Sequence, residues 1–509
     1  MRTFFLYIAL FPVFVSCHPN LPIGEPSDKA PDIFPDYTEV TVPYNIAPLN
    51  FVLKSPSADA YAVLTTNGQE WRVKAKKGKF TFPARRWTEL LKAATGQSIT
   101  VTIHAKEGEW VRYRPFQIFV AGEPVDPFIA YRLIEPGYAL WNQMGIYQRN
   151  LENFTESAIM ENRLTGYNCM NCHSFCMQNP DRMLFHLRDL FAGTLIVDGE
   201  KIEKLDTKTE QTLSPLVYPS WHPSGDFVAF SVNRTMQSFH LNHPNRIEVY
   251  DEASDVVVYD VQRHEVLTTA NLSSGEAFET FPAFSPDGKT LYFCSARTQP
   301  MPHDFEEVRY SLCAIAFDPA NRRFGAVTDT LYQADTAGRS ISFPADTAEK
   351  NVSLQADAAG RSVSFPRVSP DGKYLMYTLS DYGNFSIWHQ DADLYLMDLA
   401  TGKHTLLEAF RSDYAESYHS WSSNSRWVVF SSRRIDGLYT HPYIAHINEE
   451  GRAAKPFLLP QKDTDFYHRF FKSYNIPEFM TGKVKDRKRL FTRLAKNEQG
   501  VKATFINNP

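Results

Sequence analysis

One stretch of the chain combines two thiols and an imidazole at a spacing that suggests chemistry, Cys169-Met-Asn-Cys172-His173. Two thiols separated by two residues can reach the two vinyl groups of one porphyrin, and the adjacent imidazole can then bind the iron. The sequence therefore predicts one covalent haem c. Cys169 and Cys172 are the expected attachment sites, and His173 is the expected proximal ligand of the metal.

A second iron ligand is expected from the residues that follow. Asn179 suits a helix N-cap and Pro180 suits a first helical turn, which would place Met183 and His186 about one turn apart on the same face. We expect His186 as the distal ligand of the haem, with Met183 as the alternative, because Met177 lies too near the attachment loop. Ordinary core packing is the other interpretation of each residue.

The remaining cysteines keep further interpretations open. Cys176 is a third thiol that a haem does not require, so a disulfide within the cluster is an alternative in an oxidising compartment. A zinc or iron–sulfur site that includes His173 is another, although no second CxxC pair lies nearby. Cys294 and Cys313 fall on neighbouring predicted strands, where two independent buried thiols are favoured over a disulfide.

The N-terminus is typical of an exported protein. The apolar run over residues 4–15 is shorter than the roughly 20 residues that span a bilayer, and it ends at Cys17. This pattern resembles the lipobox of bacterial lipoproteins, which implies a signal peptide over 1–16, a lipid on Cys17 and a tether over 17–37. We expect a lipid-anchored protein of the cell envelope, with His18 favouring the outer membrane. The CxxCH motif resembles that of bacterial c-type cytochromes, and this resemblance implies that haem is attached to exported proteins, which agrees with the predicted export signal.

Composition limits the classes of partner. The chain has 53 Lys+Arg against 58 Asp+Glu, which gives a formal net charge of −5. Such a balance does not indicate a positively charged surface that would bind nucleic acid or anionic lipids. Membrane contact is expected only through the lipid anchor. The 37 Phe and 25 Tyr favour a fold made of many strands.

Four related segments recur in the C-terminal half. Each joins a short strand, a tight turn of the Ser-Pro-Asp-Gly kind and a second strand, and such recurrence indicates a propeller or a solenoid. The segments begin at Tyr218, Phe281, Phe365 and Tyr418. They resemble the repeats of the TolB-like propeller family over roughly residues 184–480, which implies a mainly all-β fold with five or six blades. The fourth copy reads Ser-Ser-Asn-Ser at its turn and departs from the pattern.

The expected organisation places the cysteine cluster between two β-domains. Short alternating runs, interrupted by one helical stretch, predict a small immunoglobulin-like β-sandwich. Residues 334–344 recur at 356–366, which predicts a tandem duplication forming a surface loop. The predicted boundaries are a sandwich over 38–120, a connecting segment with the haem site over 121–190, the propeller over 191–480 and a C-terminal tail over 481–509.

Enzyme motifs are absent from the sequence, which has no Gly-x-Ser-x-Gly elbow, no His-Glu-x-x-His and no P-loop. Two functions remain open. The first is a redox protein in which one haem transfers electrons to a redox partner or senses a small ligand. The second is a binding scaffold whose propeller takes a protein, peptide or glycan into its funnel, with the cysteine cluster serving as a structural disulfide or metal site.

Overall fold

The computed structural model describes residues 22–55, 59–135, 143–334, 360–497 and 499–507. The predicted signal peptide, the lipidation site Cys17 and most of the predicted duplication lie outside these residues. No helix in this part of the chain has the length and apolar character of a membrane span.

The N-terminal domain consists of two sheets and one helix. Its larger sheet contains β1 (Glu25–Pro26), β9 (Glu109–Arg112), β8 (Ser98–Glu107), β10 (Phe116–Ala121), β3 (Val40–Pro43), β5 (Ala60–Thr66) and β6 (Gln69–Lys74). Its smaller sheet contains β2 (Ile33–Phe34), β4 (Phe51–Leu53) and β7 (Lys79–Phe80). Helix α1 (Ala84–Ala93) buries Trp87 and Leu91 completely, so one apolar stripe of the helix packs into the core of this domain.

The rest of the described chain is a β-propeller of six blades. Blade 1 contains β14 (Met170–Phe175), β15 (Arg182–Leu187), β16 (Gly193–Asp198) and β17 (Lys201–Asp206). Blade 2 contains β18 (Val217–Trp221), β19 (Phe227–Phe239), β20 (Ile247–Asp260) and β21 (Glu265–Thr268). Blade 3 contains β22 (Ala277–Phe284), β23 (Thr290–Arg297), β24 (Ser311–Asp318) and β25 (Arg323–Tyr332). Blade 4 contains β26 (Ser362–Val368), β27 (Tyr374–Ser380), β28 (Asp393–Asp398) and β29 (His404–Leu406). Blade 5 contains β30 (Glu416–Trp421), β31 (Trp427–Ser432), β32 (His441–His446) and β33 (Phe457–Leu458). Blade 6 combines β34 (Ser473–Met480) with β11 (Phe128–Ile134), β12 (Gly145–Asn150) and β13 (Glu156–Glu161).

Blade 6 closes the ring, and two of the domain boundaries predicted from the sequence differ from those in the structure. Its innermost strand, β34, comes from the C-terminal part of the chain, whereas its other three strands come from the segment predicted as a connection over 121–190. That prediction was wrong, because the described residues between 128 and 187 include five propeller strands. The described residues of the predicted tail over 481–509 also form regular structure. It contains α3 (Lys488–Asn497), β35 (Val501–Lys502) and β36 (Thr504–Asn507), and these two strands extend blades 1 and 2.

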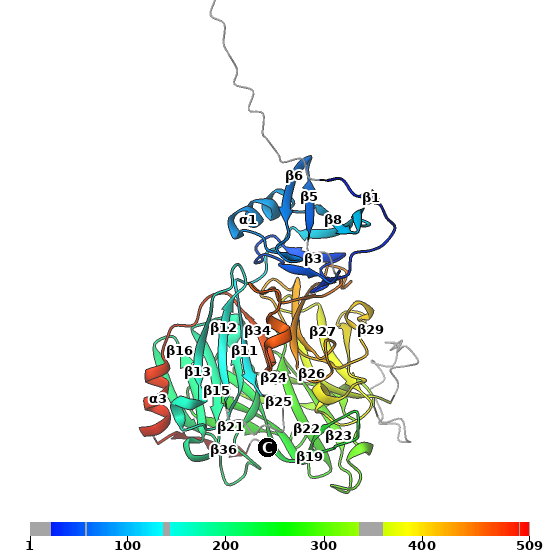
Figure 1. Cartoon of the computed structure of the whole chain (residues 1–509). Coiled ribbons are helices and arrows are strands. Elements are labelled where there is room, and N and C mark those ends of the chain that lie inside the picture. The colour runs from blue at the N-terminus through cyan, green and yellow to red at the C-terminus, as the bar shows by residue number, and fades with distance from the viewer. Residues whose placement is uncertain (1–21, 56–58, 136–142, 335–359, 498, 508–509) are drawn as a thin grey trace, which may run out of the picture.

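Short helices complete the propeller. Helix α2 (Phe466–Arg469) precedes β34, and α3 packs on the outside of blades 1 and 6, at the red end of the chain in Figure 1. The 3-10 helices are η1 (Asn162–Thr165), η2 (Cys176–Gln178), η3 (Asp189–Phe191), η4 (Phe305–Glu307), η5 (Ser386–Trp388) and η6 (Glu408–Phe410).

The repeated turns explain the local sequence pattern. In blade 3 the Gly288 N–H donates to the Ser285 carbonyl at 2.9 Å, and Gly288 has a φ of 72° that glycine adopts at little cost. In blade 5 Ser425 takes the glycine position with a φ of 62° and donates to the Ser422 carbonyl at 3.0 Å. The divergent fourth copy therefore forms the same turn.

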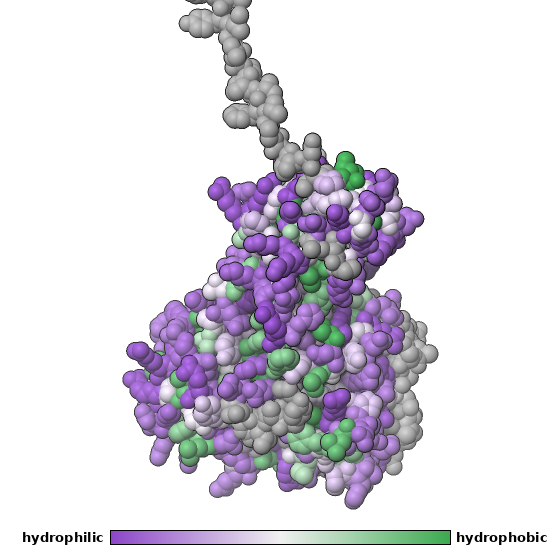
Figure 2. Space-filling view, in the orientation of Figure 1, coloured by the Kyte–Doolittle hydropathy of each residue, from purple (hydrophilic) through white to green (hydrophobic). Residues whose placement is uncertain are grey.

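The two domains share one hydrophobic core cluster and several polar contacts. Asp126 accepts hydrogen bonds from the backbone N–H of Ser423 at 2.7 Å and from its hydroxyl at 2.5 Å, and Asn50 donates to the Gln461 carbonyl at 3.1 Å. Figure 1 shows the N-terminal domain seated on one end of the propeller. In Figure 2 hydrophobic residues on this face form separate patches among hydrophilic ones.

Candidate functional site

The innermost strand of every blade carries the same irregularity. The pairing register shifts at one bulge per strand, and one residue at each bulge has a positive φ between 49° and 53°. A bulge of this kind re-aims a side chain, and a left-handed non-glycine residue is uncommon. The six residues are Cys172, Tyr218, Phe281, Phe365, Tyr418 and Ile476.

These six residues form a plug on the propeller axis. The ring centroids of Phe281 and Phe365 are 4.1 Å apart, and those of Phe365 and Tyr418 are 4.7 Å apart. Cys172 and Ile476 line the same small cavity as Tyr218, Phe365 and Tyr418, with a volume of about 20 Å³. The plug therefore nearly fills the channel at this level.

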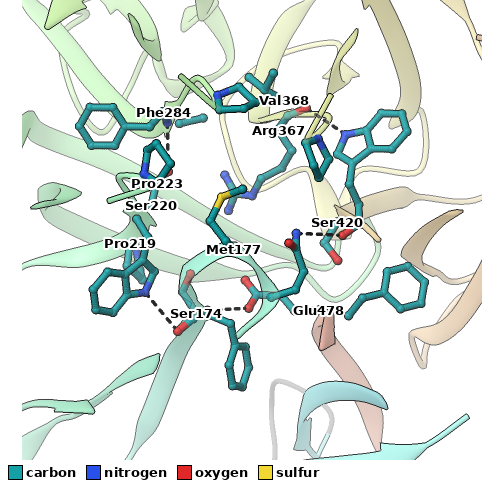
Figure 3. A pocket seen from close by; sticks show the side chains of 18 of the residues that line it. Ser174, Met177, Pro219, Ser220, Pro223, Phe284, Arg367, Val368, Ser420 and Glu478 are labelled. Atoms are coloured by element: carbon teal, nitrogen blue, oxygen red, sulfur yellow. Dashed lines mark hydrogen bonds between the residues drawn. The ribbon is translucent and has the colours of Figure 1, made fainter. Parts of the chain in front are cut away.

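A funnel opens on one side of the plug. Its lining includes the residue two positions after each plug residue, so that six equivalent side chains surround one cavity of about 130 Å³. These residues are Ser174, Ser220, Ala283, Arg367, Ser420 and Glu478. Figure 3 shows Arg367 and Met177 extending toward the middle of the funnel.

Aromatic side chains and fixed hydrogen bonds form the wall of the funnel. Trp221 donates its indole N–H to the Ser174 carbonyl at 3.3 Å, and Trp421 donates to the Arg367 carbonyl at 3.2 Å. Both bonds join neighbouring blades. The two indoles are therefore held in place before any ligand arrives.

Among the described residues, Arg367 and Glu478 are the only ionisable ones in the lining of this funnel. Glu478 accepts the Phe175 backbone N–H at 3.1 Å, and burial raises its pKa to about 8 even though Arg367 opposes the shift. Burial lowers the pKa of the Arg367 guanidinium, but arginine remains charged at neutral pH. The funnel thus holds a cationic side chain opposite a mostly protonated acid.

Two histidines occupy the position directly after the plug residue. Four blades have proline there, whereas blades 1 and 5 have His173 and His419. Burial lowers the pKa of each imidazole to about 3, so both are neutral. His419 bonds through Nε2 to the Met376 carbonyl at 3.0 Å. His173 therefore has a structural counterpart in another blade.

The opposite end of the channel is bridged by polar side chains. Strand β20 is far longer than its counterparts, and it carries Glu248 and Asp251 toward blades 3 and 4. Glu248 pairs with His389 at 3.0 Å, and Asp251 accepts hydrogen bonds from Tyr310 at 3.0 Å and from Asn384 at 2.6 Å. Ligand access from this end would require these bonds to break.

The predicted haem segment does not fit a c-type haem in this fold. Met170–Phe175 is an inner strand, and Cys169 packs in the core cluster shared by blades 1 and 6, whereas Cys172 faces the channel. Both thiols are buried, and the cavity beside Cys172 has about 20 Å³, against roughly 300 Å³ or more for a site that holds a drug-sized ligand. Thioether bonds to one porphyrin need both thiols at its edge.

The alternatives for the cysteines also find no support. Cys169, Cys172, Cys176, Cys294 and Cys313 are all free and buried. Among the residues with described coordinates, no three His, Cys, Asp or Glu side chains gather closely enough to hold a metal ion.

Cys176 and the later pair are packing residues. Cys176 packs between blades 1 and 2 and donates to the His222 carbonyl at 3.7 Å. Cys294 and Cys313 belong to two different core clusters, one on each face of blade 3, which agrees with the two independent buried thiols that the sequence favoured.

The predicted distal ligands lie on a strand. The expected helix after Pro180 was wrong, because Asn179 and Pro180 belong to the turn between β14 and β15. In β15 the two side chains point to opposite faces. Met183 packs in the cluster shared with blade 6, whereas His186 bonds to Thr194 at 2.7 Å on the side of blade 2. The strand does not bring them together.

Sequence comparisons identify no relative, since no family model and no curated protein matches the chain. Solved structures with a similar arrangement include TolB from Acinetobacter baumannii, with 12% identity and a TM-score of 0.41 over 78% of this chain and 85% of that one. An oligogalacturonate lyase in complex with manganese has 10% identity and a TM-score of 0.36, over 64% of this chain and 72% of that one. The β-propeller domain of the Trilobed protease from Pyrococcus furiosus has 9% identity and a TM-score of 0.31, over 69% and 79%. At these values the propeller assignment rests on the strand order, and no ligand or activity is inferred from the likeness.

Proposed function

We propose that this protein is an exported, lipid-anchored binding protein that takes its ligand into the axial funnel of the propeller. The observation that carries the proposal is the convergence of six equivalent inner-strand residues on one cavity, where four are small and two are ionisable. A concave site with apolar walls and few polar groups is the usual form of a ligand site. The plug limits the ligand to the funnel side.

Ligand uptake is tested by filling the funnel. Ser420 is suited to this because its hydroxyl has no hydrogen-bond partner among the residues that the structure describes, so Ser420→Phe adds bulk without removing a bond seen there. Wild-type protein and the variant are titrated calorimetrically with panels of short peptides and envelope oligosaccharides. We expect at least one class to bind the wild type and to lose binding in the variant.

The matched control is Val327→Phe, at a residue 58% exposed on strand β25 far from the funnel lining. This variant should bind like the wild type. Equal binding by Ser420→Phe and wild type would place the ligand elsewhere and contradict the proposal.

Export and anchoring are supported by the sequence alone. The apolar run over residues 4–15 and Cys17 carry this part of the proposal. Replacement of Cys17 by Ser should release the protein from membranes and abolish palmitate labelling in a bacterial host. Retention of both properties would refute lipidation at this cysteine.

A further inference from the structure

One set of equivalent residues distinguishes the blades from each other. At the funnel position, blades 1, 2, 3 and 5 have Ser174, Ser220, Ala283 and Ser420. A small residue at this position leaves room at the axis. Blade 4 instead places a guanidinium there, and blade 6 places a carboxyl group.

Arg367 has no anionic partner within the described part of the chain. It donates to the adjacent Pro366 carbonyl at 2.9 Å, and Glu478 influences it electrostatically without forming an ion pair. Because burial keeps Glu478 largely protonated at neutral pH, the positive charge of Arg367 is not compensated from inside the funnel. A half-buried, unpaired cation favours an anion from solution.

The walls define what should accompany the anion. Trp221, Phe284 and Trp421 present aromatic surface, and the prolines in the turns of the repeats add further apolar area. A volume of about 130 Å³ admits one side chain or chain end rather than a folded partner. A guanidinium pairs with a planar carboxylate through two parallel hydrogen bonds, whereas a phosphate dianion would leave one charge uncompensated beside the single cation.

We propose that the funnel selects its ligand through a carboxylate that pairs with Arg367, next to an apolar side chain that packs between the aromatic walls. This inference rests on the proposed function, because it names the chemistry of the ligand for the same site. A peptide chain end with an apolar last residue has this chemistry.

The test compares two probes that differ only in the carboxylate, N-acetylphenylalanine and N-acetylphenylalanine amide. Isothermal titration of the wild-type protein at pH 6.5 should show the acid binding about tenfold or more tightly than the amide, as expected for a charge-assisted hydrogen-bonded pair. Arg367→Gln should remove this preference. Arg367→Lys should keep only part of this preference, since an ammonium group cannot donate two parallel hydrogen bonds to a carboxylate as a planar guanidinium does.

Glu478 provides a second measurement that does not depend on the fold of the arginine variants. Its ionisation above about pH 8 should weaken acid binding by the wild type, whereas Glu478→Gln should keep tight binding at pH 9. Glu478 also borders the small plug cavity, and the other titratable groups in the lining of that cavity are His173 and His419, both neutral throughout this range, together with Cys172, Tyr218, Tyr418 and Arg367.

The outcomes separate this inference from the proposed function. Equal affinity of the wild type for acid and amide, binding of neither probe at millimolar concentration, or binding of inorganic phosphate in preference to the acid would each overturn it. If acid and amide bind equally and Ser420→Phe abolishes both, the funnel remains the binding site and only the carboxylate is wrong. If Ser420→Phe binds both probes as the wild type does, the proposed function itself fails.

Discussion

Strands β14 and β30 use similar sequences to build the same bulge with different plug residues. Blade 1 reads Cys172-His-Ser-Phe175, and blade 5 reads Tyr418-His-Ser-Trp421. In both strands the first residue has a φ near 50°, the histidine is buried and neutral, and the serine lines the funnel. The two segments differ at the plug, where a thiol in blade 1 replaces the phenol of blade 5, and at the last residue, where Phe175 replaces Trp421. A motif that suggests cofactor chemistry when read alone therefore becomes one of six equivalent inner strands when the blades are compared.

Truncation of a plug side chain gives the largest expected difference in stability between inner strands, here between Phe365 in β26 and Cys172 in β14. Phe365 contacts the rings of both Phe281 and Tyr418, so Phe365→Ala should lower the free energy of unfolding by about 3–5 kcal/mol. Cys172→Ala removes only a sulfur atom and should cost about 1 kcal/mol. Urea denaturation measures both. A loss for Cys172→Ala as large as that for Phe365→Ala would mean that the thiol does more than fill the plug.

The acidic member of the funnel ring, Glu478, gives an intermediate effect with a defined sign. The pKa of Glu478 in the folded protein is about 8, above its ordinary value of 4.5, so folding favours the protonated acid. Its contribution to stability is complete below about pH 4.5 and is lost as the pH rises through 8. Glu478→Gln should therefore gain stability relative to the wild type between pH 5 and pH 9, by a few kcal/mol at most. A constant difference across this range would show that Glu478 ionises normally.

The histidine position gives the smallest expected effect. Four blades have proline directly after the plug residue, so the backbone there accepts proline, and His173→Pro should change the free energy of unfolding by less than about 1 kcal/mol. The control is Leu184→Pro in β15, which is paired with β14 and β16 and should be strongly destabilised. Loss of the folded state in His173→Pro would break the equivalence of the blades.

The sequence predicted the repeats that keep an aromatic residue at the plug position, including the copy at Tyr418 with its divergent turn, and missed those that do not. The copies at Tyr218, Phe281 and Phe365 retain proline and the glycine turn. The copy at Cys172 was missed because cysteine replaces the aromatic residue and because residues 176–178 lengthen its turn, although the His-Ser-aromatic order matches blade 5.

Blade 6 was missed for a different reason. Its innermost strand is far from the other three in the sequence, so its closure depends on pairing between distant segments that no local pattern reveals. For the same reason Glu478 could not be placed in the funnel, whereas Arg367 stands visibly in the repeat at the position where other copies have Ser or Ala.

The absorption spectrum tests the equivalence of the six inner strands most directly. The mature protein is purified from a host that attaches haem c to exported proteins, and covalent haem is measured as the pyridine haemochrome after acid–acetone extraction. If Cys169, Cys172 and His173 serve only as structural residues of blade 1, we expect fewer than about 0.05 covalently bound haem groups per protein chain. One haem per chain that disappears in a Cys169→Ala/Cys172→Ala double variant would contradict the account.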